Sequence, residues 1–307
     1  MTKIGALIVT FNPDMDRLDQ NITAVKDQVE TIVIVDNGSI NIKEIEEKAN
    51  FYNLDVIHLH NERGIAGAQN KGMQYLRDLG VGWSLTLDQD SVMPVDAVEK
   101  FINSNAFTRK ETGLIAAQYD DPNWTEEQRN DKLDNSGRQE IQKKMVIASG
   151  NLVKVSAWEK VQGYDEWMFI DQVDFDFNAK LLLAGYEIWQ INTVVMTHEV
   201  GAVIQRPCLS TLLLFPKKAI FADHSSFREY YIQRNTIVYS KRYPEFRRHK
   251  LQTLVSIVQS RRILVYSDPL PKILAAWRGI VDGFLYSAKK DTKFQSFRKM
   301  VKENYEN

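Results

Sequence analysis

Four apolar runs rich in β-branched residues are the feature that most constrains the fold of this chain. The runs are residues 4–9, 31–35, 56–59 and 83–87. The intervals between them carry apolar residues at helical spacing, as Leu18, Ile22 and Val25 do in the first interval. Strands that alternate with helices in this way form right-handed βαβ units in a mostly parallel sheet. The sequence therefore predicts an α/β fold.

Each of the four runs is followed by polar residues of types that bind ligands. In chain order these exits read TFNP, DNGS, HNERG and DQDS. The carboxyl ends of parallel strands meet at one edge of a sheet, and ligands of open α/β sheets bind there. Turn chemistry explains some of these side chains. Four polar exits at one edge nevertheless favour a ligand site over turns alone.

Asp88 and Asp90 form a D-x-D triplet at the fourth exit. Two carboxylates this close repel each other unless a proton or a cation lies between them. A turn satisfied by its own backbone is one interpretation, and a divalent ion that holds a phosphorylated ligand is the other. His198 ends a further predicted strand, so it either adds an imidazole to the same ion or serves as a structural donor.

Two other exits also carry candidate ligand-binding residues. The carboxylate of Asp36 could accept hydrogen bonds from a ribose or a base, or it could close an Asx turn. Gly64, Gly67 and Gly72 lie near the start of a predicted helix, where backbone amides could face a phosphate. Their spacing matches neither the Walker motif nor the Rossmann motif, so those folds lose support.

A dense group of acidic and aromatic side chains follows in the second half of the chain. The acids are Asp165, Glu166, Asp171, Asp174 and Asp176, and the aromatic residues are Trp167, Phe169, Phe175 and Phe177. A carboxylate held among aromatic rings beside a sugar hydroxyl would make a good general base. The dipole of a following helix accounts for at least two of these acids without any catalytic role.

The secondary structure after residue 113 is expected to be less regular. We predict strands over residues 113–120 and 143–155, joined by a mobile loop over residues 121–140. Ser156 is expected to cap a short helix that ends at Gly163. A longer helix should begin at about Val173, and a strand should cover residues 187–195.

Composition excludes several classes of protein. The single cysteine, Cys208, rules out an internal disulfide framework and a cysteine-rich zinc site. It fits a reducing compartment, and the N-terminus has no evident signal peptide, so we expect a cytoplasmic protein. No apolar stretch approaches the ~18 residues that a membrane span needs.

The charge of the chain is unevenly distributed. Residues 1–240 carry 24 Lys and Arg against 34 Asp and Glu, whereas residues 241–307 carry 15 against 6. The basic segment contains two amphipathic helical stretches, over residues 249–267 and 269–290, which could pack on the rest of the chain or on a second subunit. They could also lie on an anionic membrane. We favour packing, because soluble helices bury such faces routinely. The segment has no nucleic-acid-binding motif, and the body is acidic, so we expect no nucleic-acid partner.

Read in order, these motifs resemble the family 2 glycosyltransferases of the GT-A fold. The matching stretches are VTFNP, IVDNGS, NERGIAGAQNKG, LTLDQDS, residues 148–177, THEVG and REYYIQRN. Within the family, the DQDS, FIDQVDFDF and YYIQRN stretches most resemble bacterial rhamnosyltransferases that use a TDP-sugar. The resemblance implies a GT-A domain over residues 1–243, with a Rossmann-like sheet flanked by helices, and a basic helical appendage over residues 244–307.

The resemblance also implies roles for individual residues. The residues expected to bind the nucleotide are Thr10, Asn12, Asp36, Asn37, Arg63, Gly67 and Asp88. Mg²⁺ or Mn²⁺ would be bound by Asp90 and His198. The sugar and the acceptor would contact Ser149, Gly150, Trp167 and Arg234. Many relatives have a Glu-Asp pair where this chain has Asp171 and Gln172, so the catalytic base is either Asp171, which we favour, or Asp174.

The implied reaction is an inverting, metal-dependent transfer of L-rhamnose from TDP-L-rhamnose to a hydroxyl of a lipid-linked or growing cell-surface polysaccharide. One alternative is a family 2 transferase that uses UDP-galactose, UDP-glucose or a galactofuranose donor. Another is a catalytically decayed nucleotide-sugar-binding protein, and a third is a nucleotidyltransferase. Peripheral contact with the inner face of the cell membrane, through the basic segment, and a homodimer are the expected associations.

Overall fold

The computed structural model describes residues 2–198, 203–204, 206–215, 221–246 and 251–306. The chain divides into two compact units. The first comprises Met1–Phe169 and Val173–Glu199, and the second comprises Ile170–Gln172 and Val200–Asn307. This division falls earlier in the chain than the domain boundary expected at residues 243–244.

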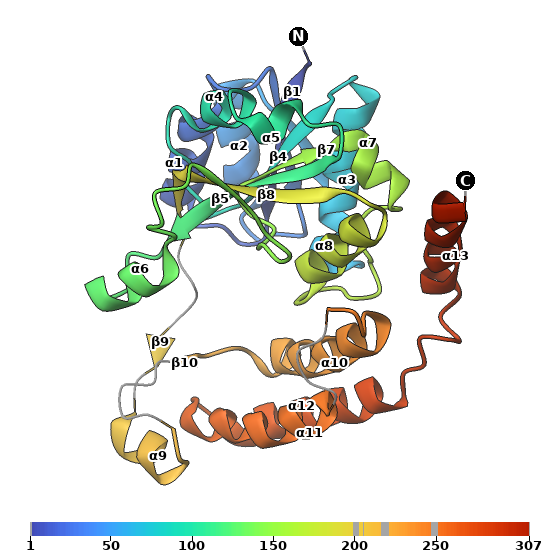
Figure 1. Cartoon of the computed structure of the whole chain (residues 1–307). Coiled ribbons are helices and arrows are strands. Elements are labelled where there is room, and N and C mark those ends of the chain that lie inside the picture. The colour runs from blue at the N-terminus through green and yellow to red at the C-terminus, as the bar shows by residue number, and fades with distance from the viewer. Residues whose placement is uncertain (1, 199–202, 205, 216–220, 247–250, 307) are drawn as a thin grey trace. The chain divides into compact units, whose positions relative to one another are not determined.

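The four apolar runs form the parallel half of an eight-stranded sheet in the first unit (Figure 1). The strands are β1 (Ile4–Thr10), β2 (Thr31–Asp36), β3 (Asp55–His58) and β4 (Trp83–Asp88). They lie in the order β3-β2-β1-β4, and each pairs in parallel with its neighbour. This arrangement confirms the predicted βαβ organisation.

The other half of the sheet is mixed. It contains β5 (Thr112–Asp120), β6 (Glu140–Gln142), β7 (Asn151–Lys154) and β8 (Glu187–Thr197). The complete order is β3-β2-β1-β4-β7-β5-β8-β6, in which β7 is antiparallel to both of its neighbours. The strand predicted over residues 143–155 is therefore too long. Gly150 has a φ of +75°, so the backbone turns immediately before β7 begins.

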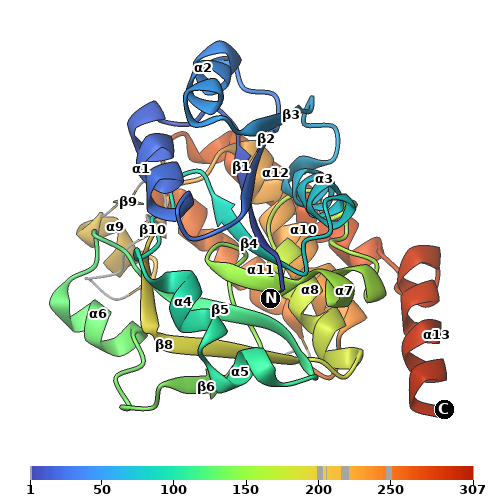
Figure 2. The same cartoon turned by 90° about the horizontal axis from the view of Figure 1, so that it is seen from above.

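Helices cover both faces of this sheet. They are α1 (Met15–Val25), α2 (Ile42–Tyr52), α3 (Gly64–Asp78), α4 (Ala97–Ile102), α5 (Asn105–Thr108), α6 (Glu126–Lys132), α7 (Val155–Lys160) and α8 (Val173–Leu183). Because side chains alternate along a strand, β1 contributes side chains to the helix layers on both faces of the sheet. Ile8 joins the core cluster that contains Ile22 of α1, whereas Leu7 packs against Gly72 of α3. Figure 2 shows α1 and α3 on opposite sides of β1.

Two local predictions about the first unit are wrong. The loop expected over residues 121–140 contains α6, because Thr125 and Gln128 form a capping box that starts a helix, and its last residue begins β6. In addition, α7 begins at Val155, one residue before the expected cap at Ser156, because β7 runs directly into it.

The second unit is built from helices and a two-stranded sheet. Its elements are β9 (Val203–Ile204), α9 (Pro207–Leu212), β10 (Phe221–Ala222), α10 (Ser226–Arg242), α11 (Gln252–Gln259), the 3₁₀ helix η1 (Ser260–Val265), α12 (Pro269–Leu285) and α13 (Thr292–Glu306). The helix expected over residues 249–267 thus changes to a 3₁₀ helix at Ser260, and α13 was not predicted.

The helices α10 and α12 pack along each other at close range. A Cβ atom added to Gly279 would lie 2.2 Å from the carbonyl oxygen of Tyr230. A Cβ added to Gly283 would lie 3.0 Å from the carbonyl oxygen of Arg234. The glycines of α12 therefore allow the two helix backbones to approach each other.

Candidate functional site

The carboxyl ends of the parallel strands bring three predicted nucleotide-binding residues together. In the register of the sheet, Thr10 of β1 lies beside Asp36 of β2. On the other side of β1, Val9 lies beside Asp88 of β4. The expected clustering of the strand exits at one edge of the sheet is therefore present.

Asp36 is the centre of a hydrogen-bonded turn at this edge. It is almost fully buried. Its Oδ1 accepts hydrogen bonds from the hydroxyls of Thr10 (3.0 Å) and Ser39, and its Oδ2 accepts bonds from the backbone amides of Gly38 (3.1 Å) and Ser39 (3.0 Å). The Asx turn that was one interpretation of Asp36 in the sequence is therefore present. Asp36 holds the loop that follows β2 in place.

Side chains also tie the neighbouring exits to one another. The Oδ1 of Asn12 accepts a hydrogen bond from the amide of Ile40 (2.8 Å). The side-chain amide of Asn37 donates to Asn61 (2.8 Å). The Oε1 of Gln89 accepts a bond from the backbone amide of Phe11 (2.7 Å). These bonds connect the exits of β1, β2, β3 and β4 to one another.

A second network joins the D-x-D triplet to β7 and β8. The hydroxyl of Ser149 accepts a bond from the amide of Asp88 (2.9 Å) and donates to Ser91 (2.8 Å). The hydroxyl of Ser91 in turn bonds to Nδ1 of His198 (2.9 Å). The same Nδ1 lies 3.4 Å from Oδ1 of Asp90. The two predicted metal ligands are therefore adjacent, and Ser91 holds the imidazole of His198 in place.

The pair of Asp90 and His198 fits a divalent cation. Oδ1 of Asp90 is buried and has no hydrogen-bond partner among the described residues. Ligands at adjacent positions of an octahedral magnesium site are about 3 Å apart, given metal–oxygen distances of about 2.1 Å. Oδ1 of Asp90 lies 3.4 Å from Nδ1 of His198, a nitrogen that also bonds to Ser91, so the two side chains are close enough to share one ion. No group of three or more His, Cys, Asp and Glu side chains in the described part of the chain could hold a metal. The remaining ligands would have to come from a phosphorylated substrate and from water.

The electrostatic potential at Asp90 and His198 favours a positive charge. Burial disfavours the imidazolium form of His198, but the carboxylates of Asp90 and Asp88 outweigh it, and the net effect raises the pKa of this side chain. A site that stabilises an imidazolium is a site of negative potential. The same potential would attract a metal cation.

The start of α3 is attached to the acidic and aromatic segment. Gly64 has a φ of +60°, and a Cβ there would lie 2.1 Å from the carbonyl oxygen of Phe169. The Nη1 atom of Arg63 pairs with Oε2 of Glu166 at 2.6 Å. A Cβ added to Gly67 would lie 2.5 Å from the Cβ of Arg63. Gly64 and Gly67 therefore allow close packing at the start of α3, independently of any contact between their backbone amides and a phosphate.

Asn70 fixes the same segment from within α3. Its side-chain amide donates to the carbonyl of Tyr164 and to Glu166, both at 3.0 Å. Its Oδ1 accepts bonds from the amide of Tyr164 (2.9 Å) and the indole of Trp158 (3.2 Å). Trp167 follows in this segment with 46% of its surface exposed. It is therefore available for contact with a sugar ring.

The other predicted residues of the first unit have local structural partners. Gly150 could not be replaced without displacing Met196, whose sulfur would lie 2.8 Å from the new Cβ. Asp174 is in the first turn of α8 and accepts a bond from the amide of Phe175 (2.8 Å). The helix dipole favours a negative charge at this position, which is the structural role expected for at least two acids of the segment.

Asp171 belongs to the second unit, where an arginine holds it. Nε of Arg228 lies 3.2 Å from both carboxylate oxygens of Asp171, and Nη2 lies 3.1 Å from Oδ1. The side-chain amide of Asn235 donates to the backbone carbonyls of Ile170 (2.7 Å) and Asp171 (2.9 Å). Asp171 itself has a φ of +60°. Two side chains of α10 therefore maintain a strained backbone conformation at the predicted base.

The surroundings of Asp171 are rich in charge. Burial raises the pKa of Asp171 and Arg228 opposes this, and the net change is upward. Glu229, the next residue of α10, is fully buried, and Nη2 of Arg262 lies 4.0 Å from its Oε2. Burial raises the pKa of Glu229 as well. Arg234 is buried against Asn235 (2.9 Å) and over the ring of Tyr231.

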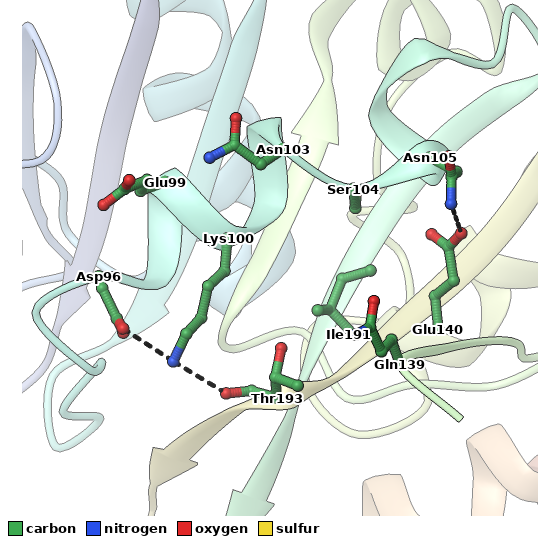
Figure 3. Close-up of a pocket in the computed structure, with 10 residues that line it drawn as sticks. All are labelled: Asp96, Glu99, Lys100, Asn103, Ser104, Asn105, Gln139, Glu140, Ile191 and Thr193. Atoms are coloured by element: carbon green, nitrogen blue, oxygen red, sulfur yellow. Dashed lines mark hydrogen bonds and ion pairs between the residues drawn. The ribbon is translucent and has the colours of Figure 1, made fainter. Parts of the chain in front are cut away.

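A separate pocket of about 400 Å³ lies in the first unit and contains none of the predicted site residues (Figure 3). Its polar groups bond to one another. Lys100 pairs with Asp96 (2.8 Å) and donates to the carbonyl of Thr193 (3.2 Å), and Glu140 accepts a bond from Asn105 (2.7 Å). We therefore assign the ligand site to the strand ends and not to this pocket.

Several residues of the site could not be assigned from the sequence. Ser91, Asn70 and Arg228 lie inside the quoted motifs, but nothing local distinguishes their roles. The bonds of Ser91 and Asn70 to His198 and Glu166 join residues 107 and 96 positions apart. Arg228 and Asp171 are 57 positions apart. Such contacts depend on the tertiary fold.

The sequence of this chain is similar to those of known proteins. Residues 6–158 match the family described as Glycosyl transferase family 2. The chain is also 27% identical over 248 residues to the dTDP-rhamnosyl transferase RfbF of Shigella flexneri, a match that covers 77% of this chain and 79% of that protein.

Solved structures support the fold. A crystal structure of GalNAc-T7 with UDP, GalNAc and Mn²⁺ superposes with a TM-score of 0.58 at 11% identity, over 99% of this chain. The present chain spans only 57% of the length of that protein. Residues 1–349 of TarS from S. aureus, in complex with UDP, superpose with a TM-score of 0.52 at 13% identity, covering 99% of this chain and 89% of that one. The fold is the GT-A type predicted from the motifs.

Proposed function

Since the chain is a family 2 glycosyltransferase with a rhamnosyltransferase-like sequence, we propose that it transfers L-rhamnose from TDP-L-rhamnose to a hydroxyl of a lipid-linked or growing cell-surface polysaccharide. The similarity to RfbF over most of both chains supports the choice of donor. The pairing of Asp90 with His198, beside the exits of the parallel strands, is the single observation that supports the reaction type.

The proposed reaction is one displacement with inversion at the anomeric carbon. Asp171 accepts the proton of the acceptor hydroxyl while that oxygen forms a bond to the anomeric carbon. The bond from the anomeric carbon to the diphosphate oxygen breaks, and the nucleoside diphosphate leaves with the electron pair. General-base catalysis of this kind contributes about 10²–10⁴-fold to the rate.

Asp90 and His198 are the residues that would hold Mg²⁺ or Mn²⁺. When bound, the cation supplies positive charge that stabilises the leaving diphosphate. Ser91, which itself bonds to Ser149, keeps His198 in position. The loop held by Asp36 and Asn12 would support the nucleoside, and Trp167 would face the sugar or the acceptor.

The test is a turnover assay with TDP-L-rhamnose, UDP-galactose and UDP-glucose, each with and without Mn²⁺, in which the released nucleoside diphosphate is measured. We expect turnover with TDP-L-rhamnose that depends on the metal and is lost in Asp90→Asn. Asp96→Asn is the matched control, because Asp96 is an equally charged side chain that pairs with Lys100 outside the site. Faster turnover of a UDP-sugar would refute the donor assignment. Full metal-dependent activity of Asp90→Asn would refute the site.

A further inference from the structure

The turn over residues 88–91, which we call the D-x-D turn, is fixed by the fold at its first residue. The side-chain amide of Asn21, a buried residue of α1, donates a hydrogen bond to the backbone carbonyl of Asp88 (2.7 Å). The amide of Asp88 donates to the hydroxyl of Ser149 (2.9 Å). The second half of the turn carries Asp90, whose buried Oδ1 has no hydrogen-bond partner among the described residues. A ligand at Asp90 would therefore order the half of the turn that the fold holds less firmly.

Gln89 lies between the two aspartates, and its side chain bonds to the exit of β1. Its Oε1 accepts a hydrogen bond from the backbone amide of Phe11 at 2.7 Å. Phe11 follows β1 directly, and Asn12 after it has a φ of +50°. A positive φ is uncommon for a residue with a side chain, so this loop depends on its hydrogen bonds to keep its shape. The side chain of Gln89 thus links the D-x-D turn to the exit of β1.

The exit of β1 is itself bonded to the loop that follows β2. The amide of Asn12 donates to the hydroxyl of Ser39 (2.7 Å), and that hydroxyl donates to Asp36. In the proposed function, Asn12 and Asp36 hold the loop that would support the nucleoside. A path of hydrogen bonds, interrupted only by the peptide bond between Phe11 and Asn12, therefore runs from Gln89 to the nucleoside site.

We propose that Gln89 is a positioning residue that couples binding of the nucleoside to binding of the divalent cation. This inference rests on the proposed function, because it takes Asp90 as a metal ligand and the exit of β1 as part of the nucleoside site. When Asp90 holds a cation, the second half of the D-x-D turn is restricted to one arrangement. Gln89 then keeps the amide of Phe11, and with it the exit of β1, in the arrangement that the nucleoside needs. Such coupling is reciprocal, so the nucleoside raises the affinity for the cation by the same factor.

The expected size of the coupling follows from the single hydrogen bond that carries it. The net contribution of one hydrogen bond corresponds to roughly a twofold to tenfold change in an equilibrium constant. A nucleoside diphosphate would contact the cation through its phosphates, so part of its coupling to the cation is direct and does not need Gln89. Thymidine has no phosphate. An effect of the cation on thymidine binding therefore reports coupling through the protein.

The experiment is a titration of the full chain with thymidine, with and without saturating Mg²⁺, followed by broadening of the thymidine NMR signals. TDP is titrated in parallel, because its binding tests the proposed nucleotide site itself. We expect Mg²⁺ to tighten thymidine binding to the wild type by roughly twofold to tenfold. In Gln89→Ala this factor should fall to about one, while the affinity for Mg²⁺ without thymidine, measured by calorimetry, stays that of the wild type. Gln89→Glu keeps an oxygen that can accept the bond from Phe11, so it should retain the coupling.

The matched control is Gln128→Ala. It also removes a glutamine whose Oε1 accepts a bond from a backbone amide, that of Thr125 at 2.9 Å, at the start of α6. This variant should keep the coupling factor of the wild type.

Two results would overturn the proposal while leaving the proposed function intact. One is TDP binding by a wild type in which Mg²⁺ has no effect on thymidine. The other is a Gln89→Ala variant that keeps the wild-type coupling factor, even if it binds thymidine more weakly by the same ratio with and without Mg²⁺, because that result would give Gln89 a structural role only. A wild type that binds neither thymidine nor TDP would refute the proposed function together with this inference.

Discussion

The ion pair between Arg228 and Asp171 leads to a quantitative prediction about the pH dependence of the reaction. Arg228 contacts both carboxylate oxygens at 3.1–3.2 Å, and it acts to lower the pKa of Asp171 against the effect of burial. An opposite charge at close range lowers the pKa of a carboxyl by about 1–3 pH units. Removing it in Arg228→Gln should therefore raise the pKa of Asp171 further.

The sign of the effect on activity follows from the role of the base. As the proposed base, Asp171 must be deprotonated to accept the acceptor proton, so the acidic limb of kcat/KM should move to higher pH in Arg228→Gln. At a fixed pH on that limb, a pKa that is higher by about one lowers the rate about tenfold, because about tenfold less of the base is ionised. The activity should recover as the pH is raised. The measurement is the release of nucleoside diphosphate across the pH range.

Two variants separate this effect from a loss of structure. Arg228→Lys keeps the charge but not the paired hydrogen bonds, so its acidic limb should lie between those of the wild type and Arg228→Gln. Arg278→Gln makes the same change in net charge at an exposed site of α12, and its profile should match the wild type. An Arg228→Gln enzyme that is slower at every pH, with an unmoved acidic limb, would refute the reasoning.

Three further predictions concern folding stability. Gly64→Ala should cost at least about 3 kcal/mol in urea unfolding, because φ is +60° and the new Cβ would lie 2.1 Å from the carbonyl oxygen of Phe169. Gly80→Ala, at φ +74° in open space, should cost only about 1 kcal/mol, and equal losses would contradict the account. Asn70→Ala should cost about 2–4 kcal/mol, because it removes four hydrogen bonds that hold the acidic segment, and an unchanged denaturation midpoint would count against it. Burial and two nearby arginines lower the pKa of His224 from 6.5 to about 4. Between these pH values the folded chain binds fewer protons than the unfolded chain, so the folded chain loses stability as the pH falls from 6.5 to 4. His224→Gln should flatten the melting temperature between pH 6.5 and 4, and an unchanged slope would show that other groups dominate.

The parallel half of the sheet could be predicted because its signals are local. The runs that became β1, β2, β3 and β4 are apolar and β-branched over their whole length, as strands buried on both faces are. The antiparallel position of β7 could not be predicted, because pairing direction depends on how distant segments return to the sheet. The helix α6 was missed for a different reason, since its capping box stands in a polar stretch with few apolar residues to mark a helix.

Which face of α12 is buried also could not be read from periodicity. The pattern of large apolar residues indicated an amphipathic helix and favoured packing of its apolar face. The structure places Gly279 and Gly283 against α10, because only residues without a Cβ let the two backbones come this close. Most of the large apolar side chains then remain exposed on the other face, although Ile280 is buried.

By itself, the sequence determined the kind of fold, the chemistry of the strand exits and the adjacency in sequence of Asp88 and Asp90, because these follow from hydrophobic periodicity and residue type along a short stretch of chain. The tertiary structure alone decided that Arg228 holds Asp171, and it placed His198 beside Asp90, a pairing that only the family resemblance had implied. Those contacts join residues far apart in the chain, and no local preference of the backbone encodes them. They form because packing of the sheet and helices brings the segments together, and charge and hydrogen bonding then select the partners.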